Sequence, residues 1–380
     1  MPDVEDEHWK LIKRGAMKGL DKDQHPVRFV VVTSVVSGLT VAAMTAGAGQ
    51  LFYIRLLTYR VPLWTLALLF LATVVLFVWG VVLCRARKTQ VFFILCALNE
   101  KRWVAELIQN LYHALDRHQL DLVLKVPERD YVYVGQLRHL RNLRKRRGAY
   151  AGGIISPTEP DLIRGDLRSF CAAYPVVFVD IKPFDSTGDY PNRTAFVGYS
   201  QEALGACAAS YVEEHARSSQ ISHPRVLVIG GKLHSGRQTE FVRCLNYRFK
   251  DAEFIVDEDG EYSRTRAREI VLRNLQERSN ERAGPHYIFC TNDEMALGAV
   301  DALHVAGVGS DGSVVVVGVD GIREARALID SQTTPLQATV VQDSCSIAEI
   351  SVDLLVKLTR RDAVKTCTYL EPRIYTIGSY

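Results

Sequence analysis

The chain has 380 residues, enough to bury one or two hydrophobic cores. Its formal net charge is only +3, which gives no general reason to expect a nucleic acid as partner. The eight cysteines are scattered, without a Cys-x-x-Cys pair or a Cys/His cluster at metal-ligand spacing, and most lie in apolar runs. This pattern predicts buried thiols in a reducing compartment, and neither a disulfide framework, a metal site nor a cofactor is expected.

Two long stretches near the N-terminus, 29–54 and 61–84, contain no Asp, Glu, Lys or Arg. About 20 apolar residues span the hydrocarbon core of a bilayer. The second stretch is rich in Leu, Val and Phe, whereas the first carries small and hydroxyl residues that suit close helix packing in lipid. We therefore predict a two-helix transmembrane hairpin over 29–84, preceded by an N-terminal segment, 1–28. Alternatively, the first stretch lies at the membrane interface or is an uncleaved signal-like segment.

The distribution of Lys and Arg predicts the orientation of this hairpin. Six basic residues precede the first stretch and Arg85, Arg87 and Lys88 follow the second, whereas the link between them has only Arg55 and Arg60. Two spans then place both ends and the large domain in the cytoplasm, at a bacterial inner membrane. The hairpin would contact lipid and could join copies of the chain in a homo-oligomer. With a single span, the domain would instead be periplasmic.

Beyond the hairpin, apolar runs of strand length alternate with helical patterns. Strands are expected at 91–95, 120–126, 153–155, 176–180, 225–230, 287–290 and 314–317, and helices at 103–115, at 136–147 and after Asn292. Such alternation predicts parallel sheets covered on both faces. The basic edge of the 136–147 helix is interpreted first as a solvated face, then as a contact for anionic lipid headgroups, and last as a nucleic-acid contact.

Two of these buried strands are followed closely by polar residues. Asn292 follows the strand at 287–290 and is placed to cap the next helix, and Asp320 follows the strand at 314–317. Ligands of open parallel sheets bind at the carboxyl ends of the strands, so both side chains are placed to hold a polar ligand. The plainer alternatives are a helix cap alone for Asn292 and a turn-forming Asp-Gly pair for Asp320.

Several segments resemble one known family. The run from Asn292 to Ala299 is similar to that of the ribose/galactose periplasmic binding proteins and of the sugar-binding domain of lactose-repressor-type regulators. The resemblance extends to 338–342, to Arg237 placed four residues before an aromatic residue, and to 195–206. It runs from about Thr89 to Tyr380.

This resemblance implies an α/β fold with two lobes, each a doubly wound parallel sheet, joined by hinge crossovers and enclosing a ligand cleft. The implied first lobe comprises 89–197 and 343–366. The implied second lobe comprises 198–342 and 367–380.

The resemblance also implies a set of ligand-binding residues, since sugar recognition uses planar polar side chains for hydroxyls and aromatic faces for the ring. The matching positions are Asn99, Trp103, Asp180, Arg237, Tyr262, Asn292, Asp320 and Gln342. Two departures count against ribose itself. Ile181 stands where ribose binders have an arginine, and Lys101 and Arg102 add charge to the first loop, which favours a phosphorylated or otherwise anionic sugar.

The expected function is that of a membrane-anchored sensor, not an enzyme, whose lobes close on a sugar-like small molecule and signal to the hairpin. The alternative is an extracytoplasmic solute-binding protein serving a transporter or receptor, which requires a single span. An enzyme acting on a sugar or nucleoside would need a base in the cleft, for which His234 is the candidate. The run 307–312 matches a dinucleotide fingerprint by letter, but it precedes a strand and is interpreted as a loop.

Overall fold

A computed structural model describes part of the chain, namely residues 71–79, 89–99, 101–146, 148–277, 284–309 and 312–379. The N-terminal segment 1–28, the first predicted span and most of the second therefore lie outside the described residues. Residues 71–79 are helical, and among the described helices none combines the length and apolar character needed to cross a membrane. The predicted hairpin and its orientation remain predictions.

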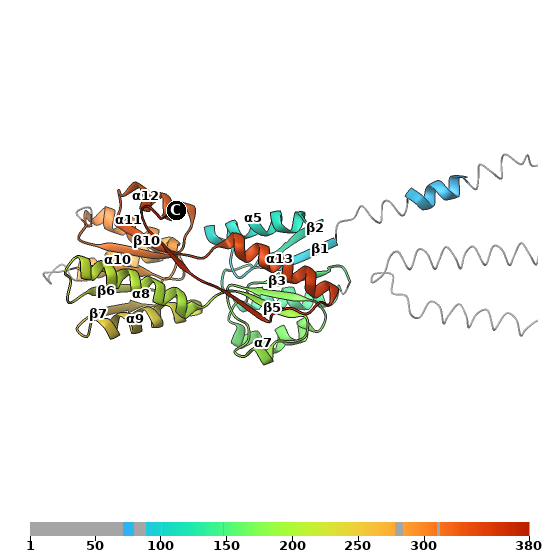
Figure 1. The fold of residues 1–380 in the computed structure, drawn as a ribbon, viewed down its shortest axis with the longest axis horizontal. Helices are drawn as coiled ribbons and strands as arrows, with labels where there is room; N and C mark the ends of the chain where they lie inside the picture. The colour runs from blue at the N-terminus through green and yellow to red at the C-terminus, as the bar shows by residue number, and fades with distance from the viewer. Residues whose placement is uncertain are drawn as a thin grey trace, which may run out of the picture. The chain divides into compact units, whose positions relative to one another are not determined.

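Contacts divide the chain into two compact units, 1–90 with 143–151 and 91–142 with 152–380. The second unit contains nearly all of the described elements. Within the described residues its core is built on two six-stranded sheets, each the centre of one lobe (Figure 1). The predicted two-lobed α/β fold is thus confirmed.

The sheet of the first lobe is formed by strands from both ends of the domain. In spatial order its strands are β11 (Cys367–Leu370), β5 (Thr194–Tyr199), β4 (Val176–Val179), β3 (Gly152–Ile155), β1 (Thr89–Ile94) and β2 (Leu120–Lys125). Strands β1, β3, β4, β5 and β11 run parallel. Every residue of β3, β4 and β5 is buried, as expected for strands covered by helices on both faces.

The sheet of the second lobe also has six strands, and one of its edge strands is antiparallel. In spatial order its strands are β12 (Arg373–Tyr375), β10 (Leu336–Val341), β9 (Val315–Asp320), β8 (Tyr287–Cys290), β6 (Arg225–Ile229) and β7 (Glu253–Asp257). The edge strand β12 runs antiparallel to β10, and the other neighbours pair in parallel.

Helices cover both sheets. Those of the first lobe are α5 (Arg102–Asp116), α6 (Tyr133–Arg144), α7 (Pro160–Cys171) and α13 (Ser344–Arg360). Those of the second lobe are α8 (Gln201–Ser218), α9 (Ser235–Arg248), α10 (Arg264–Glu277), α11 (Asp293–Ala306) and α12 (Arg323–Ser331). Two short 3-10 turns are η1 (Thr187–Asp189) and η2 (Lys232–His234). Helix α13 packs on α5 and on β3, β4 and β5, while α8 pairs with α9 and α10 with α11.

Two glycines allow the paired helices of the second lobe to touch through their backbones. A Cβ at Gly205 of α8 would lie 2.1 Å from the carbonyl oxygen of Arg237 in α9, and one at Gly298 of α11 would lie 2.1 Å from that of Arg264 in α10. Both distances are far below van der Waals contact. The first of these contacts sets the position of Arg237, the residue that lies at the centre of the site described below.

The chain passes between the lobes three times, after β5, after β10 and after β11 (Figure 1). Two crossings are tied together, because the Asp343 N–H donates to the Tyr199 hydroxyl at 3.0 Å. The last crossing differs from the predicted boundary. Strand β11 pairs with β5, so 367–370 belongs to the first lobe, although the resemblance had assigned 367–380 to the second. Strand β11 pairs with the free edge of β5, and the chain then crosses to the second lobe at 371–372.

The predicted strands of the two sheets are present, and the helix predicted at 103–115 is α5. The helix predicted at 136–147 begins earlier, at Tyr133, and ends at Arg144. Helices α7, α9, α10, α12 and α13 and the edge strand β7 were not predicted individually. Their apolar residues are sparser than those of the buried strands, and β7 has no fully buried residue, so no long apolar run marks it.

Candidate functional site

Polar residues follow the carboxyl ends of strands in both lobes and meet between the two sheets. Asp180 follows β4 in the first lobe, and Asn292 follows β8 in the second. Asp320 ends β9, and Gln342 follows β10. Asp180 has φ 67° and Asp320 has φ 122°, backbone conformations that are uncommon outside glycine and that concentrate at functional sites.

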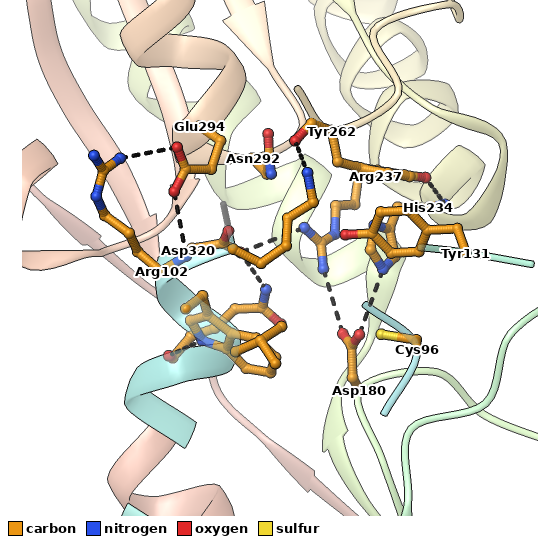
Figure 2. A pocket seen from close by; sticks show the side chains of 14 residues that line it. Cys96, Arg102, Tyr131, Asp180, His234, Arg237, Tyr262, Asn292, Glu294 and Asp320 are labelled. Carbon is orange, nitrogen blue, oxygen red and sulfur yellow. Dashed lines mark hydrogen bonds and ion pairs between the residues drawn. The ribbon is translucent and has the colours of Figure 1, made fainter. Parts of the chain in front are cut away.

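These residues line one cavity between the lobes (Figure 2). Seven of the eight predicted ligand residues contribute to its wall: Trp103, Asp180, Arg237, Tyr262, Asn292, Asp320 and Gln342. The enclosed volume is about 30 Å³, which holds about two water molecules. A monosaccharide is larger, so it can enter only when the lobes move apart.

Asn99 is the predicted residue that the structure does not bring to this cavity. Its side chain is exposed, and its Nδ2 donates to a carboxylate oxygen of Asp130 at 3.3 Å. The other Asp130 oxygen accepts the Asn99 main-chain N–H at 3.1 Å. Asn99 therefore shapes the loop ahead of α5, and the resemblance placed it in the ligand set from its position in the sequence alone.

Arg237 lies at the centre of the site and is only 1% exposed. Its Nε donates to Gln201 Oε1 at 2.6 Å and its Nη1 to the carbonyl oxygen of Thr291 at 2.7 Å, which fixes the guanidinium plane. Asp180 and Asp320 each have a carboxylate oxygen 3.8 and 3.7 Å, respectively, from a guanidinium nitrogen. Both distances exceed a hydrogen bond, so Arg237 attracts the two carboxylates without binding either directly.

The two carboxyl groups have opposite pKa shifts. Burial works against ionisation of Asp180, yet the neighbouring His234 and Arg237 hold its pKa below the ordinary value. Burial raises the pKa of Asp320 to about 7, and the nearby Arg237 and the hydrogen bond from Gln342 offset only part of this rise. Asp180 is therefore ionised at neutral pH, whereas Asp320 keeps its proton to a higher pH than an ordinary carboxyl group.

A third carboxyl group, Asp293, is fully buried and does not line the cavity. It accepts hydrogen bonds from the Ile322 N–H at 2.8 Å and from the Thr339 hydroxyl at 2.7 Å. Burial and the neighbouring Asp320 raise its pKa well above the ordinary value. Asp293 thus joins the segment that follows β9 to β10.

The remaining predicted residues are held by specific hydrogen bonds. The Trp103 indole N–H donates to the carbonyl oxygen of Gln342 at 2.9 Å, and the Gln342 amide Nε2 donates to Asp320 Oδ1 at 2.7 Å. Asn292 Oδ1 accepts the Met295 N–H at 3.0 Å, so it caps α11 as the sequence predicts and also lines the cavity.

Lys101 and Arg102 join the first lobe to the second at the edge of the cavity. The Lys101 ammonium donates to the carbonyl oxygen of Tyr262 at 2.7 Å. Arg102 pairs with Glu294 and Glu324, each at 2.9 Å. From the sequence, both cations are expected to favour an anionic ligand, whereas in the structure their charges meet the backbone and carboxylates of the other lobe.

Half of the cavity wall was not in the predicted set. The additional residues are Cys96, Lys101, Arg102, Val104, Tyr131, His234 and Glu294. Tyr131 packs on Tyr262 with ring centroids 4.8 Å apart, and it lies in a turn that no strand or helix pattern marks. His234 had a signal in the sequence only as a candidate base. Among the described residues, no group of three or more His, Cys, Asp or Glu is placed to hold a metal ion.

Solved structures share this fold. A periplasmic solute-binding protein of an ABC transporter from Actinobacillus succinogenes, with bound D-allose, has a TM-score of 0.66 at 18% identity, covering 76% of this chain and 98% of that one. A solute-binding protein from Agrobacterium vitis, with bound D-fucose, has a TM-score of 0.67 at 19% identity, covering 76% and 95%. At such low identity the similarity shows the fold alone.

Curated relatives are closer in sequence. The D-allose-binding periplasmic protein of Escherichia coli is 30% identical over 168 residues, which is 43% of this chain and 50% of that protein. A putative rhizopine-binding protein of Rhizobium meliloti is 30% identical over 212 residues, which is 54% of this chain and 64% of that protein. The chain thus spans half to two thirds of these two relatives. The ribose operon repressor of Escherichia coli is 22% identical over 298 residues, which is 78% of this chain and 83% of that protein.

The curated relatives are named as binding proteins and repressors, and none of these names is that of an enzyme, in line with the expected binding role. A model of the periplasmic binding protein domain matches residues 91–362, nearly the whole of the two lobes. The resemblance drawn from the strand ends and from Arg237 therefore holds across the domain. The chain belongs to the periplasmic binding protein domain family.

Proposed function

We propose that this chain is a binding protein for a small polyhydroxylated, sugar-like ligand held between its two lobes. The observation that carries this proposal is the convergence of carboxylate, guanidinium and carboxamide side chains from both lobes on one cavity. Such groups bind adjacent hydroxyls in pairs, and aromatic faces suit the C–H side of a sugar ring. Trp103 and Tyr262 supply such faces in the wall of the cavity.

The named ligands of the relatives support this class of ligand. D-allose, D-fucose and myo-inositol are bound in solved structures of the same fold, and D-allose and rhizopine occur in the names of two relatives that are 30% identical. The two departures noted in the sequence, Ile181 and the charged loop, argue against ribose as the ligand.

Ligand entry requires hinge opening, because the closed cavity is smaller than a sugar. A wider groove of about 1080 Å³ shares Lys101, Tyr131 and Tyr262 with the cavity, and it is the route by which a ligand would reach it. Closure would then bring the contacts from Lys101 and Arg102 to the second lobe into place around the ligand. A ligand shifts this equilibrium only by its preference for the closed form.

The finer proposal is that the domain is anchored in the membrane and reports ligand binding to its N-terminal segment. It rests on the two uncharged stretches, 29–54 and 61–84, and on the strand that follows them. Strand β1 begins at Thr89 and is followed by Cys96 in the cavity wall, so the same short segment adjoins both the predicted hairpin and the ligand site. Contact with lipid and self-association through the hairpin belong to this proposal.

An extracytoplasmic solute-binding protein is the second candidate. It is favoured by the periplasmic relative and by the transporter proteins of the same fold. The two candidate functions predict opposite sides of the membrane for the C-terminal domain, so a topology measurement distinguishes them. A C-terminal phosphatase fusion is active only outside the cytoplasm, and a fluorescent-protein fusion matures only inside. A fluorescent, phosphatase-negative chain would support the sensor, and the reverse result would support the solute-binding protein.

Ligand binding itself is tested by calorimetry on the full-length chain in lipid nanodiscs, with D-allose, L-arabinose, D-fucose and myo-inositol as probes. Asp180→Asn should weaken binding of the best probe by about 10- to 100-fold, because it removes a charged acceptor for hydroxyls. The exposed Asp362→Asn is the matched control and should leave affinity unchanged. Equal affinity in Asp180→Asn and the control would contradict this site.

A further inference from the structure

His234 occupies a fixed position in the wall of the cavity. It is the last residue of η2, 7% exposed, and it lies directly before the first turn of α9. Its ring packs edge-on against Tyr262, with centroids 4.9 Å apart and planes at 73°. Its main-chain N–H donates to the Tyr262 hydroxyl at 3.0 Å. Tyr262 therefore fixes His234 through two contacts, one with the imidazole ring and one with the His234 main-chain N–H. Neither contact uses a nitrogen of the imidazole ring.

Both ring nitrogens of His234 are buried and have no hydrogen-bond partner among the described residues. Asp180 Oδ2 lies 3.7 Å from Nε2, which is longer than a hydrogen bond but close enough for electrostatic attraction. Arg237 repeats this pattern, since its Nη2 also has no hydrogen-bond partner in the described part of the chain and lies 3.8 Å from Asp180 Oδ1. Three polar groups thus face one another without a direct hydrogen bond, so a ligand hydroxyl placed beside them could contact two of them at once (Figure 2).

The chemistry of the three groups is complementary. Burial and the neighbouring Arg237 lower the pKa of His234, so its ring is neutral and offers one N–H donor and one lone pair. Asp180 is an acceptor and Arg237 a donor. A ligand hydroxyl both donates and accepts, so it could donate to the Asp180 carboxylate while it accepts from Arg237 or from the imidazole N–H. The second imidazole nitrogen would then accept from a neighbouring hydroxyl.

We propose that His234 is a ligand-contacting residue that, together with Asp180 and Arg237, selects a ligand with two adjacent hydroxyls at this end of the cavity. The inference rests on the proposed ligand-binding function, and it assigns His234 a role in recognition. A histidine kept only for folding would have its nitrogens bonded within the protein, because unpaired buried nitrogens reduce stability.

This distinction gives a test that needs no known ligand. His234→Phe keeps an aromatic ring against Tyr262 and removes two unpaired buried nitrogens, which offsets the lost attraction to Asp180, so the unfolding temperature of the ligand-free full-length chain should stay the same or rise by up to about 2 °C. His223→Phe, at an exposed position, is the control for the exchange itself. A fall in the unfolding temperature of His234→Phe relative to this control would show a structural role and overturn the inference.

Binding supplies the second readout, with D-allose, L-arabinose, D-fucose and myo-inositol as probes. His234→Phe should weaken binding of the best probe by about 10- to 100-fold, and His234→Gln, which keeps a donor and an acceptor, should restore most of it. Unchanged affinity in His234→Phe would overturn the inference while leaving the proposed function intact. If no probe binds the unaltered chain, the proposed function fails for these sugars, and an unfolding temperature that stays the same or rises in His234→Phe still supports the assignment of His234.

Discussion

Trp103 at the start of α5 donates its indole N–H to the main-chain oxygen of Gln342, 239 positions further along the chain and 2.9 Å away. Gln342 stands at the second crossing between the lobes, and its side chain donates to the Asp320 carboxylate of the second lobe. One aromatic residue of the first lobe is thus joined to the hinge and, through it, to a carboxylate at the ligand cavity. Domain closure and the geometry of the cavity are linked by two hydrogen bonds.

Trp103→Phe should separate these roles, because phenylalanine keeps an aromatic face but has no N–H. We expect the free energy of unfolding to fall by about 1 kcal/mol, as for the loss of one buried hydrogen bond, and ligand dissociation to become faster. Differential scanning calorimetry and stopped-flow dissociation measure the two effects. Tyr112→Phe, on the exposed side of the same helix, is the control and should change neither. An unaltered unfolding temperature in Trp103→Phe would argue against the link through Gln342.

Arg102→Gln should loosen the closed form, because Arg102 pairs with Glu294 and Glu324 across the lobes. Its side chain is 46% exposed, so the effect is expected to be modest, at most about fivefold in ligand dissociation rate. Added salt should speed dissociation from the unaltered chain and have less effect on the variant, since screening weakens the same ion pairs.

Arg117→Gln is the matched control for this experiment, because Arg117 pairs with Glu349 inside the first lobe. Stopped-flow dissociation in low and high salt compares the three chains. Equal rates and equal salt dependence in Arg102→Gln and Arg117→Gln would show that the bridge between the lobes does not restrain opening.

The raised pKa of Asp320 predicts a specific dependence of the free energy of unfolding on pH. Burial raises its pKa from 3.8 to about 7, so between about pH 4 and 7 the folded chain keeps a proton that the unfolded chain has lost. Stability contributed by this group therefore falls as pH rises through that window. Asp320→Asn cannot ionise, so relative to the unaltered chain it should gain about 1.4 kcal/mol or more between pH 4 and pH 8.

Thermal unfolding of both chains across this range measures the difference and cancels the titration of groups that Asp320 does not influence. The charged or titratable neighbours of Asp320 are Arg237, Asp180, Glu294 and Asp293, and the Asp320→Asn substitution retains all four. Asp362→Asn, at the surface, should show no such trend. A difference that stays constant from pH 4 to pH 8 would mean that Asp320 is already ionised throughout.

Gly205→Ala should displace the helix that carries Arg237. The added Cβ would lie 2.1 Å from the Arg237 carbonyl oxygen, so α8 and α9 must separate. We expect a loss of about 1–3 kcal/mol in the free energy of unfolding, together with weaker ligand binding. Gly165→Ala in α7 is the control, because a Cβ there meets no atom within 4 Å, and it should leave the chain equally stable or slightly more stable. Thermal unfolding and calorimetry distinguish the two variants.

Much of the fold could be predicted because the buried strands are continuous apolar runs. Strands such as β4 and β8 are apolar throughout and buried throughout, and this pattern is local in the sequence. The cap at Asn292 is likewise local, since its partner is the N–H of Met295. The boundary at 367 was misplaced because β11 is assigned to a lobe by its pairing with β5, which lies far away in the sequence.

The sequence pattern alone therefore determined Asn292 and Asp320 as strand-ending ligand candidates, because parallel strands present their carboxyl ends at one edge of a sheet, and the family resemblance added Asp180 and Gln342. Tertiary structure decided what those residues meet. In the folded chain, the Asn99 side chain donates to Asp130, and Arg102 pairs with Glu294 of the second lobe. Tertiary structure also placed His234 with two unpaired nitrogens beside Asp180. These outcomes depend on contacts between residues distant in sequence, which the period of an apolar pattern does not encode.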